Sequence, residues 1–346
     1  LLVITAPLST WLLTMMASTG QVSFACMPII VEVAKENRLR PTRALAISVV
    51  ASLLGIVASP ISAAVIFFSG ILEKNHQGWG YLELISVMIP ATFLALLCTS
   101  LFYLVWDNIR QTDQLSADAP GVSTQTMVDS IPPGAKRSVL IFIMGLIAVL
   151  LYAMISSPRS GLIAHPVLNS GQVRISVMMA VALMIVIFCR VNVHNIPATS
   201  VFKTGMTSCI CILGVAWLGS TFMDSNQVWL QSKVSDYLSD SPLLLALIIM
   251  LVSCFLYSQA ASTKILFPLA LGMSITPATL VACFPATASL FILPNYPTLL
   301  AAVALDDTGS TRLGTRIIDH PFILPGLMAT LLSIMFSAGF TLLFYA

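Results

Sequence analysis

Residues 258–264 read Ser258-Gln259-Ala260-Ala261-Ser262-Thr263-Lys264, and this polar stretch lies inside an apolar run from Leu243 to Leu271. Leucine, isoleucine and methionine dominate the sequence before it, and Ile-Leu-Phe-Pro-Leu-Ala-Leu follows it directly. Irregular backbone at membrane depth is tolerated only where it is buried in protein or lines a wet cavity. The stretch therefore predicts the tip of a hairpin buried at membrane depth.

The whole chain is apolar. Of its 346 residues, 58% are hydrophobic and only 9% are charged, and its mean hydropathy is +0.95. Average soluble domains carry about 25% charged residues, so most of this chain is expected to lie in a lipid bilayer. Its net charge of +2 and its lack of long basic runs disfavour nucleic acid as a partner. Its cysteines and histidines show no metal-ligand spacing and it has no phosphate-binding loop, so we expect neither a metal site nor ATP hydrolysis.

The apolar segments fall into two kinds. A helical membrane span needs about 20 apolar residues. Five segments meet this requirement without interruption: 82–106, 138–156, 173–190, 204–223 and 322–345. Four others are interrupted by small polar residues or proline: 1–34, 44–72, 242–271 and 277–304. We predict that 1–34 and 242–271 are hairpins, and that 44–72 and 277–304 are helices broken at 58–62 and 293–298.

These parts occur twice in the same order, which predicts two structural repeats. The first repeat occupies 1–106, a cytoplasmic linker 107–137, and the second repeat 138–346. With 35–43 assigned to the cytoplasm, the cytoplasmic loops carry eleven Lys and Arg residues and the opposite loops four, as the positive-inside rule requires. One hairpin then enters from each side, so the repeats are inverted, as in many secondary transporters. Because three helices precede the second hairpin and none precedes the first, we expect three further helices upstream of Leu1.

The tips and breaks form the predicted substrate site. Free amides at the N-terminus of a half-helix attract anions, and small hydroxyl residues let a ligand approach them. The candidate substrate-binding residues come from these four places: Ser18, Thr19, Gly20, Ser59, Pro60, Ser62, Ser258, Gln259, Ser262, Thr263, Lys264, Asn295 and Thr298. Close packing between membrane helices is the alternative interpretation, because Ser, Thr and Gly are common at such contacts.

Lys264 is the one basic residue that this topology places inside the membrane. A lysine at the bilayer centre costs about 2.5–3.5 kcal/mol on insertion scales, so its presence needs compensation. Two functional roles fit, namely attraction of a substrate carboxylate or replacement of a coupling cation. The alternative is that the side chain snorkels or pairs with a carbonyl near the tip.

Asp307-Thr308-Gly309-Ser310 matches the short signature of aspartic proteases. That chemistry needs two carboxylates that share a proton, whereas this sequence has a single copy in a loop. The chain is therefore not expected to be an enzyme. We expect Asp306 and Asp307 instead to cap the broken helix or to pair with Arg312 or Arg316.

From about Ala17 to the C-terminus, the chain resembles the anaerobic C4-dicarboxylate transporters of the Dcu A/B family. In the first half the resemblance is carried by Ser18-Thr19-Gly20, Met27-Pro28-Ile29-Ile30, Arg40-Pro41-Thr42-Arg43 and Ile56-Val57-Ala58-Ser59-Pro60-Ile61-Ser62. In the second half it is carried by Gly214-Val215-Ala216-Trp217, Tyr257-Ser258-Gln259-Ala260-Ala261, Leu293-Pro294-Asn295-Tyr296-Pro297-Thr298, Asp307-Thr308-Gly309-Ser310-Thr311-Arg312 and Phe322-Ile323-Leu324-Pro325-Gly326. A lysine at 264 is closer to the A branch of the family than to the B branch, where this position is apolar.

The resemblance implies an all-α polytopic membrane protein with the ion-transporter superfamily fold, that is, two inverted-topology repeats with re-entrant hairpins and broken transmembrane helices. It implies a multi-pass carrier of the bacterial inner membrane that transports fumarate, malate, succinate and aspartate by alternating access. Such carriers are antiporters that exchange fumarate for succinate in anaerobic respiration, and they also catalyse uptake coupled to H+ or Na+.

The expected partners are small dicarboxylates and the lipid bilayer, and the expected cofactors are none beyond the coupling Na+ or H+. The sequence leaves open whether the chain forms a homo-oligomer. The alternative function is that of a membrane partner that reports dicarboxylate to a sensor kinase. Nothing in the sequence resembles a signalling domain, which disfavours this as the sole role.

Overall fold

The computed structural model describes residues 1–75, 79–110, 134–155, 170–199, 242–272, 275–316 and 318–345, with isolated residues between 202 and 229. Within these residues the chain is helical and has no β-strand. The helices before the predicted linker are α1 (Leu2–Ala17), η1 (Gly20–Val22), α2 (Ser23–Glu36), α3 (Thr42–Val57), α4 (Ala63–Asn75) and α5 (Tyr81–Arg110). Those after it are α6 (Ala135–Ile155), α7 (Ser170–Phe188), η2 (Val193–Ala198), α11 (Pro242–Leu256), α12 (Gln259–Gly272), α13 (Pro277–Cys283), η4 (Phe284–Phe291), α14 (Pro297–Leu305) and α15 (Ile323–Tyr345).

The chain divides into two compact units, one made of Leu1–Val122 and Thr204–Ala346 and the other of Ser123–Lys203. In the second unit α6 packs against α7 at Gly145, where an added Cβ atom would lie only 2.3 Å from Val181 Cγ2. The first unit combines elements of both predicted repeats. The repeat boundaries therefore stay predictions, as does the linker, most of which lies outside the described residues.

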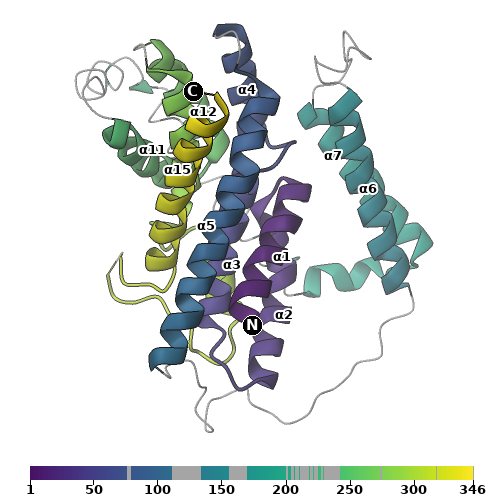
Figure 1. Cartoon of the computed structure of the whole chain (residues 1–346). Coiled ribbons are helices and arrows are strands. Elements are labelled where there is room, and N and C mark those ends of the chain that lie inside the picture. Colours follow the sequence, from purple (N-terminus) through teal and green to yellow (C-terminus); the bar gives the residue numbers. More distant parts are fainter. Residues whose placement is uncertain are drawn as a thin grey trace. The chain divides into compact units, whose positions relative to one another are not determined.

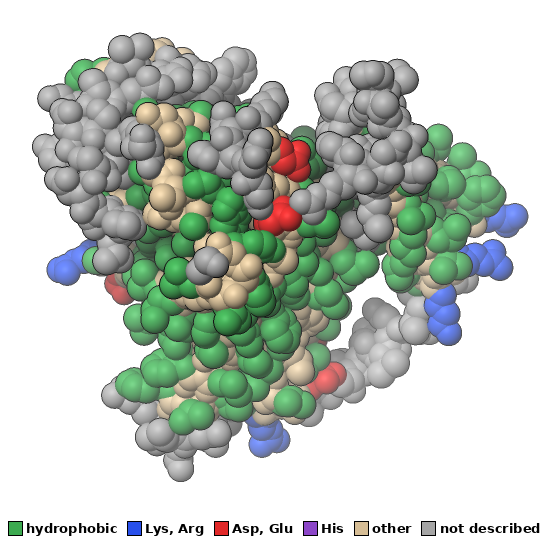
Figure 2. Space-filling view, turned by 45° about the horizontal axis from the view of Figure 1, so that its top comes forward, with side chains coloured by type: hydrophobic (Ala, Val, Ile, Leu, Met, Phe, Trp, Pro, Cys, Tyr) green, Lys and Arg blue, Asp and Glu red, His purple; other side chains and the backbone are tan. Residues whose placement is uncertain are grey.

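Four of the five uninterrupted spans correspond to single helices, α5, α6, α7 and α15, while 204–223 lies almost entirely outside the described residues. In the part of the chain that the structure describes, α5 over 81–106 and α15 are the two helices long and apolar enough to cross a membrane. Their outer faces are apolar: on α15, Leu324, Met335 and Leu342 are all exposed. On the face drawn in Figure 2, hydrophobic side chains cover much of the described surface, and large contiguous apolar surfaces mark contact with a membrane or with another protein.

The helices break where small polar residues and prolines predict a break. Residues 18–19 separate α1 from η1, 257–258 separate α11 from α12, 58–62 separate α3 from α4, and 292–296 separate η4 from α14. At both tips the first helix ends on a left-handed residue, Ser18 with φ 58° and Tyr257 with φ 50°. This conformation is uncommon outside glycine, and at a helix end it redirects the chain. The same elements thus follow one another twice, while the re-entrant geometry of the hairpins and the inversion of the repeats stay predictions.

Helix α3 lies at the centre of the first unit. From Ala44 to Val57 every residue except Ile56 is buried, and the helix packs against α1, α2, α5, α14, α15 and η4. Beside it, the ring of Phe68 in α4 lies 4.5 Å from that of Phe267 in α12 and 5.1 Å from that of Phe284 in η4, measured between centroids. The core is therefore built from both halves of the sequence.

The helix pairs in this unit are reciprocal. Helix α2 packs against α14 of the other half, and α12 packs against α4 of the first half. The long helices α5 and α15 lie side by side (Figure 1). Helix α3 also contacts η4. Each half is thus completed by helices of the other.

Candidate functional site

The first tip is a short turn held by hydroxyl groups. Ser18 ends α1, and Oγ1 of Thr19 accepts a hydrogen bond from the amide of Gln21 at 3.3 Å. Ser23 Oγ donates to the carbonyl oxygen of Gly20 at 2.7 Å. A hydroxyl at the N-cap accepts from one of the amides that the first helical turn leaves unpaired. The tip is therefore ordered by its own side chains, with a small residue, Gly20, at its apex.

The second tip uses the same device. Ser258 Oγ accepts from the amide of Ala261 at 3.2 Å, and Ser262 Oγ donates to the carbonyl of Ser258 at 2.8 Å. Thr263 Oγ1 donates to the carbonyl of Gln259 at 2.7 Å. Three of the predicted hydroxyls thus act first on the local backbone of α12.

Both tips meet helix α3 at neighbouring residues. A Cβ atom added to Gly20 would lie 3.5 Å from Ile56 Cδ1 and 3.6 Å from Ser52 Oγ, which is ordinary van der Waals contact. At the other tip Gln259 Nε2 donates a 2.8 Å hydrogen bond to the carbonyl of Leu53. Because Ser52 and Leu53 are adjacent along α3, the structure brings the two tips to the same level of one buried helix.

The first break places its residues in different environments. Ser59 is buried, and Ser62 Oγ accepts from the amide of Val65 at 3.1 Å, so Ser62 caps α4. The carbonyl of Pro60 accepts a 2.8 Å hydrogen bond from the Tyr81 hydroxyl at the start of α5. The break is thus fixed by a cap and by a contact that the sequence alone did not predict.

The second break is tied to the second tip. Asn295 Oδ1 accepts a hydrogen bond from the hydroxyl of Tyr257, and the Tyr257 ring stacks on that of Tyr296 with centroids 6.2 Å apart. Thr298 is buried in the first turn of α14. Sequence reasoning missed the role of Tyr257, although an aromatic residue directly before a polar tip was an available signal.

Several buried polar atoms in this region lack a protein partner among the described residues. They are Ser59 Oγ, Gln259 Oε1, Ser289 Oγ and Thr298 Oγ1. Buried polar groups are rarely left unpaired, and water or a ligand commonly supplies the missing bond. Three of these atoms belong to residues that the sequence nominated for substrate binding.

Lys264 lies on another face of α12. It is exposed, with Nζ 5.8 Å from the centroid of the Phe67 ring in α4, whereas Gln259, Ser262 and Thr263 are buried. A cation over an aromatic face is stabilised by the ring quadrupole. This geometry offers one form of the compensation that a lysine in an apolar helix needs, and a role of Lys264 in substrate binding stays a prediction.

The loop after α14 is organised by a buried carboxylate. Asp306 accepts from the amide and hydroxyl of Thr308 at 3.1 and 2.5 Å, from Ser310 Oγ at 2.9 Å and from the amide of Thr311 at 2.6 Å. Burial alone would raise the pKa of Asp306, but these hydrogen bonds outweigh it and the pKa lies below its usual value. Asp306 is the residue at which α14 ends, but its side chain bonds to the following loop and not to the helix.

Asp307 pairs with a lysine that the sequence did not nominate. Its Oδ2 lies 2.7 Å from Lys35 Nζ at the end of α2, and Thr42 Oγ1 at the start of α3 donates to Ser310 Oγ at 2.8 Å. The Nε of Arg312 donates instead to the carbonyl of Gly309 at 2.6 Å. The loop around 35–43, which was assigned to the cytoplasm, and the loop around 305–320, which the same topology places on that side, therefore lie against each other.

A family model described as "Anaerobic c4-dicarboxylate membrane transporter", covering DcuA and DcuB, matches residues 1–345. The chain belongs to this family. Like other family members it is a membrane transporter and not an enzyme. Among solved structures there is no match.

Named relatives of the family place the chain in its DcuA-type branch. It is 43% identical to the C4-dicarboxylate transporter DcuA of Escherichia coli K12 over 345 residues, 98% of this chain and 78% of that protein. It is 42% identical to DcuA of Wolinella succinogenes over 95% of this chain and 76% of that protein. Identity to the anaerobic C4-dicarboxylate transporter DcuB of Escherichia coli O6:H1 is 30%, over 96% of this chain and 77% of that protein.

Proposed function

We propose that the chain is a secondary carrier of C4-dicarboxylates, namely fumarate, malate, succinate and aspartate, and that it works by alternating access. The observation that carries the proposal is the meeting of both tips at Ser52 and Leu53 of α3. A dicarboxylate has two anionic ends, and the N-termini of α2 and α12 each supply amides that attract an anion.

Buried polar atoms without partners support a site at this place. A carboxylate between the tips would accept a hydrogen bond from the Thr298 hydroxyl, and a water or the ammonium group of aspartate would donate one to Gln259 Oε1; neither atom has a partner among the described residues. Leaving such groups unpaired costs about 1–3 kcal/mol each, so a ligand or water that pairs them is favoured.

The reciprocal helix pairs support two inverted repeats. A two-fold relation between the halves requires that α2–α14 and α4–α12 be equivalent contacts, and that α5 pair with α15. Inverted repeats that enclose a site near the bilayer midplane are a common design of secondary transporters. In this arrangement motion of the hairpins and broken helices against the remaining helices exposes the site alternately to each side of the bacterial inner membrane.

Fumarate–succinate exchange under anaerobic conditions, with additional uptake coupled to H+ or Na+, is the transport mode that we propose. The test uses the protein in proteoliposomes loaded with succinate, and it measures entry of radiolabelled fumarate with and without gradients of Na+ and pH. Liposomes loaded with acetate are the control. Entry that is no faster with succinate inside would contradict exchange, and no entry of any C4-dicarboxylate would contradict the substrate class.

A matched pair of substitutions tests the location of the site. Thr298 and Thr330 are both fully buried threonines whose hydroxyls have no partner among the described residues, but Thr330 lies on α15. Thr298→Val keeps the side-chain shape and removes the hydroxyl, so we expect at least a ten-fold loss of uptake. Thr330→Val should leave uptake within about two-fold, and equal losses would argue that the hydroxyl of Thr298 serves packing alone.

A further inference from the structure

His320 lies in the loop directly before α15 and contacts the second break. Its Nε2 is 3.2 Å from the carbonyl oxygen of Ile292, the first residue after η4. Because a carbonyl only accepts hydrogen bonds, Nε2 carries a proton, and in a neutral ring Nδ1 then has none. Nδ1 is buried and has no hydrogen-bond partner among the described residues. The contact is therefore complete with a neutral imidazole, and a second ring proton would have no acceptor.

A second contact reinforces this one. An added Cβ atom at Gly326 in α15 would lie 2.3 Å from Cε2 of Phe291, whose side chain is fully buried. The absence of a side chain at Gly326 thus lets the aromatic ring rest against the backbone of α15. The start of α15 therefore engages two consecutive residues, Phe291 and Ile292, where the second broken helix ends its first half.

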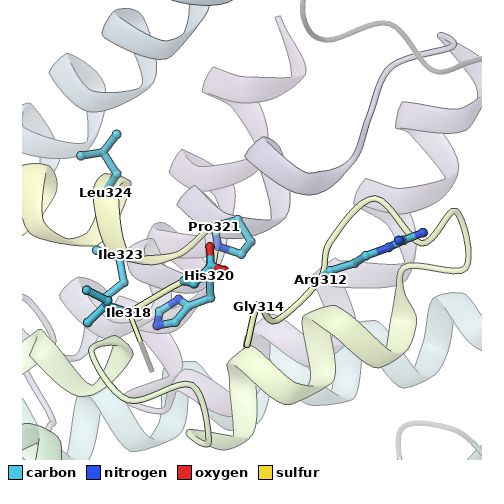
Figure 3. A pocket seen from close by; sticks show the side chains of 8 residues that line it. Arg312, Gly314, Ile318, His320, Pro321, Ile323 and Leu324 are labelled. Atoms are coloured by element: carbon cyan, nitrogen blue, oxygen red, sulfur yellow. The ribbon is translucent and has the colours of Figure 1, made fainter. Parts of the chain in front are cut away.

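Few charges surround the imidazole. Helices η4, α13 and α15, which pack together here, contain no charged residue. Asp319 is adjacent in the loop, and a pocket of about 480 Å³ lies against His320, Asp319 and Arg312. The Arg312 side chain extends away from His320 (Figure 3), and its Nε is engaged by the Gly309 carbonyl. Asp319 is thus the one carboxylate near the ring among the described residues.

We propose that His320 is a proton-sensitive positioning residue, which holds the second break against α15 when neutral and releases it when protonated. The inference rests on the proposed transport function, because it is the movement of this break that opens the site. Burial lowers the pKa of His320, opposed by the Ile292 carbonyl and by the charge of Asp319. A conformation in which the ring reaches water binds the proton more tightly, so a fall in pH favours that conformation.

The first test measures release without transport. Ala329, one turn beyond Gly326, is fully buried, and Ala329→Cys adds a thiol that becomes reactive when α15 separates from the break. Labelling by a membrane-permeant maleimide is measured from pH 5 to pH 8 with His320 and with His320→Gln, and the labelling of proteins without the added cysteine is subtracted. Glutamine can still donate to the Ile292 carbonyl but does not titrate. The ratio of the two rates removes the intrinsic pH dependence of the thiol.

We expect the labelling rate with His320 divided by the rate with His320→Gln to be near one at pH 8 and to rise several-fold as the pH falls. A ratio that stays constant overturns the proposal. Asp319→Asn is a second variant that keeps the histidine: it removes the charge that raises the pKa of His320, so the rise should move to lower pH. An unchanged midpoint in Asp319→Asn would also contradict the proposal.

A transport measurement distinguishes failure of this inference from failure of the proposed transport function. Fumarate–succinate exchange at equal internal and external pH should change with pH over the same range as the labelling ratio, and the dependence should be lost in His320→Gln. A pH-dependent labelling ratio without any dicarboxylate exchange would leave the role of His320 standing and refute the proposed function. Exchange with a labelling ratio that does not change with pH would support the proposed function and refute the role of His320.

Discussion

Gln259 joins two distant parts of the chain through one side chain. Its amide nitrogen holds the Leu53 carbonyl, so the second tip is fixed to α3. Gln259→Met keeps the length and loses the hydrogen bond, and we expect the free energy of unfolding to fall by about 1 kcal/mol. Uptake should fall more, at least ten-fold, because the tip is no longer held at the site. Chemical unfolding in detergent and proteoliposome uptake measure the two effects.

The control for Gln259 is another side-chain amide that donates to a carbonyl. Asn37 is exposed, and its Nδ2 donates to the Val33 carbonyl at 2.7 Å at the end of α2. Asn37→Ala should change stability and uptake little, since water replaces an exposed bond. Normal uptake by Gln259→Met would show that the tip does not depend on its attachment to α3.

Asp306 predicts a pH dependence of stability. Because its hydrogen bonds hold the pKa below the usual value, its contribution is fully present above the unfolded pKa of about 3.9 and is lost as the pH falls through the lower folded pKa. Asp306→Asn should therefore destabilise by about 2 kcal/mol at pH 7, the order expected for bonds to a buried charge. The difference from the unmodified protein should be constant from pH 8 to pH 5 and shrink below about pH 4.

Asp307 is the neighbouring control for that measurement. Its side chain is 56% exposed and pairs with Lys35, an arrangement whose contribution is about 0–1 kcal/mol. Asp307→Asn should thus cost less than Asp306→Asn in the same unfolding assay. The opposite order would mean that the ion pair, and not the buried carboxylate, anchors the loop to α2.

At the scale of single elements, two glycines of α15 allow a matched comparison. Gly326→Ala would force a methyl group to within 2.3 Å of the Phe291 ring, and overpacking of this kind costs about 1–3 kcal/mol. Gly339 lies in the same helix with nothing within 4 Å, so Gly339→Ala should stabilise by up to about 1 kcal/mol through helix propensity. Thermal unfolding in detergent compares the two. Equal shifts would show that the Phe291 contact adapts without cost.

The positions of the helix breaks could be predicted from the sequence, but the long-range hydrogen bonds formed around them could not. Proline and small polar residues act on the local backbone, so their positions indicated interruptions at 18–20, 258–264, 58–62 and 293–298. The structure places them at 18–19, 257–258, 58–62 and 292–296, and residues 259–264, predicted as part of a tip, already form the first turns of α12. Gln259 and His320 form hydrogen bonds with the backbone carbonyls of Leu53 and Ile292. Every residue carries a backbone carbonyl, so no sequence pattern marks these two as partners. Long-range packing alone brings them to these side chains.

Helix faces were also beyond sequence reasoning. In a membrane protein both lipid and the protein interior are apolar, so the pattern of hydrophobic residues does not mark the buried side of a helix. The sequence accordingly identified Lys264 as a residue that needs compensation, but not that it lies above Phe67 on a face away from Gln259. The pairing of Asp307 with Lys35 was missed for a different reason, namely that these residues are distant in sequence.

For the whole molecule, the reciprocal pairs α2–α14 and α4–α12 make each hairpin depend on the other half of the chain. With both tips at one level of α3, a ligand in this place faces elements from both halves at once. If the proposed site lies here, binding at one tip is expected to affect the other. The two tips should therefore respond to substrate as one site.

Protection of introduced cysteines by substrate tests whether the two tips form one site. Ser18 and Ser258 are half-buried at the two tips, and serine to cysteine is nearly isosteric. In Ser18→Cys and Ser258→Cys proteins, fumarate should slow maleimide labelling at both positions with the same half-saturating concentration, because one dicarboxylate spans both anion sites. Acetate, with a single carboxylate, should protect much less. Leu12→Cys, on an exposed position of α1, serves as the unprotected control. Protection at one tip only, or different half-saturating concentrations, would mean that the tips bind separate ligands and that the reciprocal packing serves stability and not a shared site.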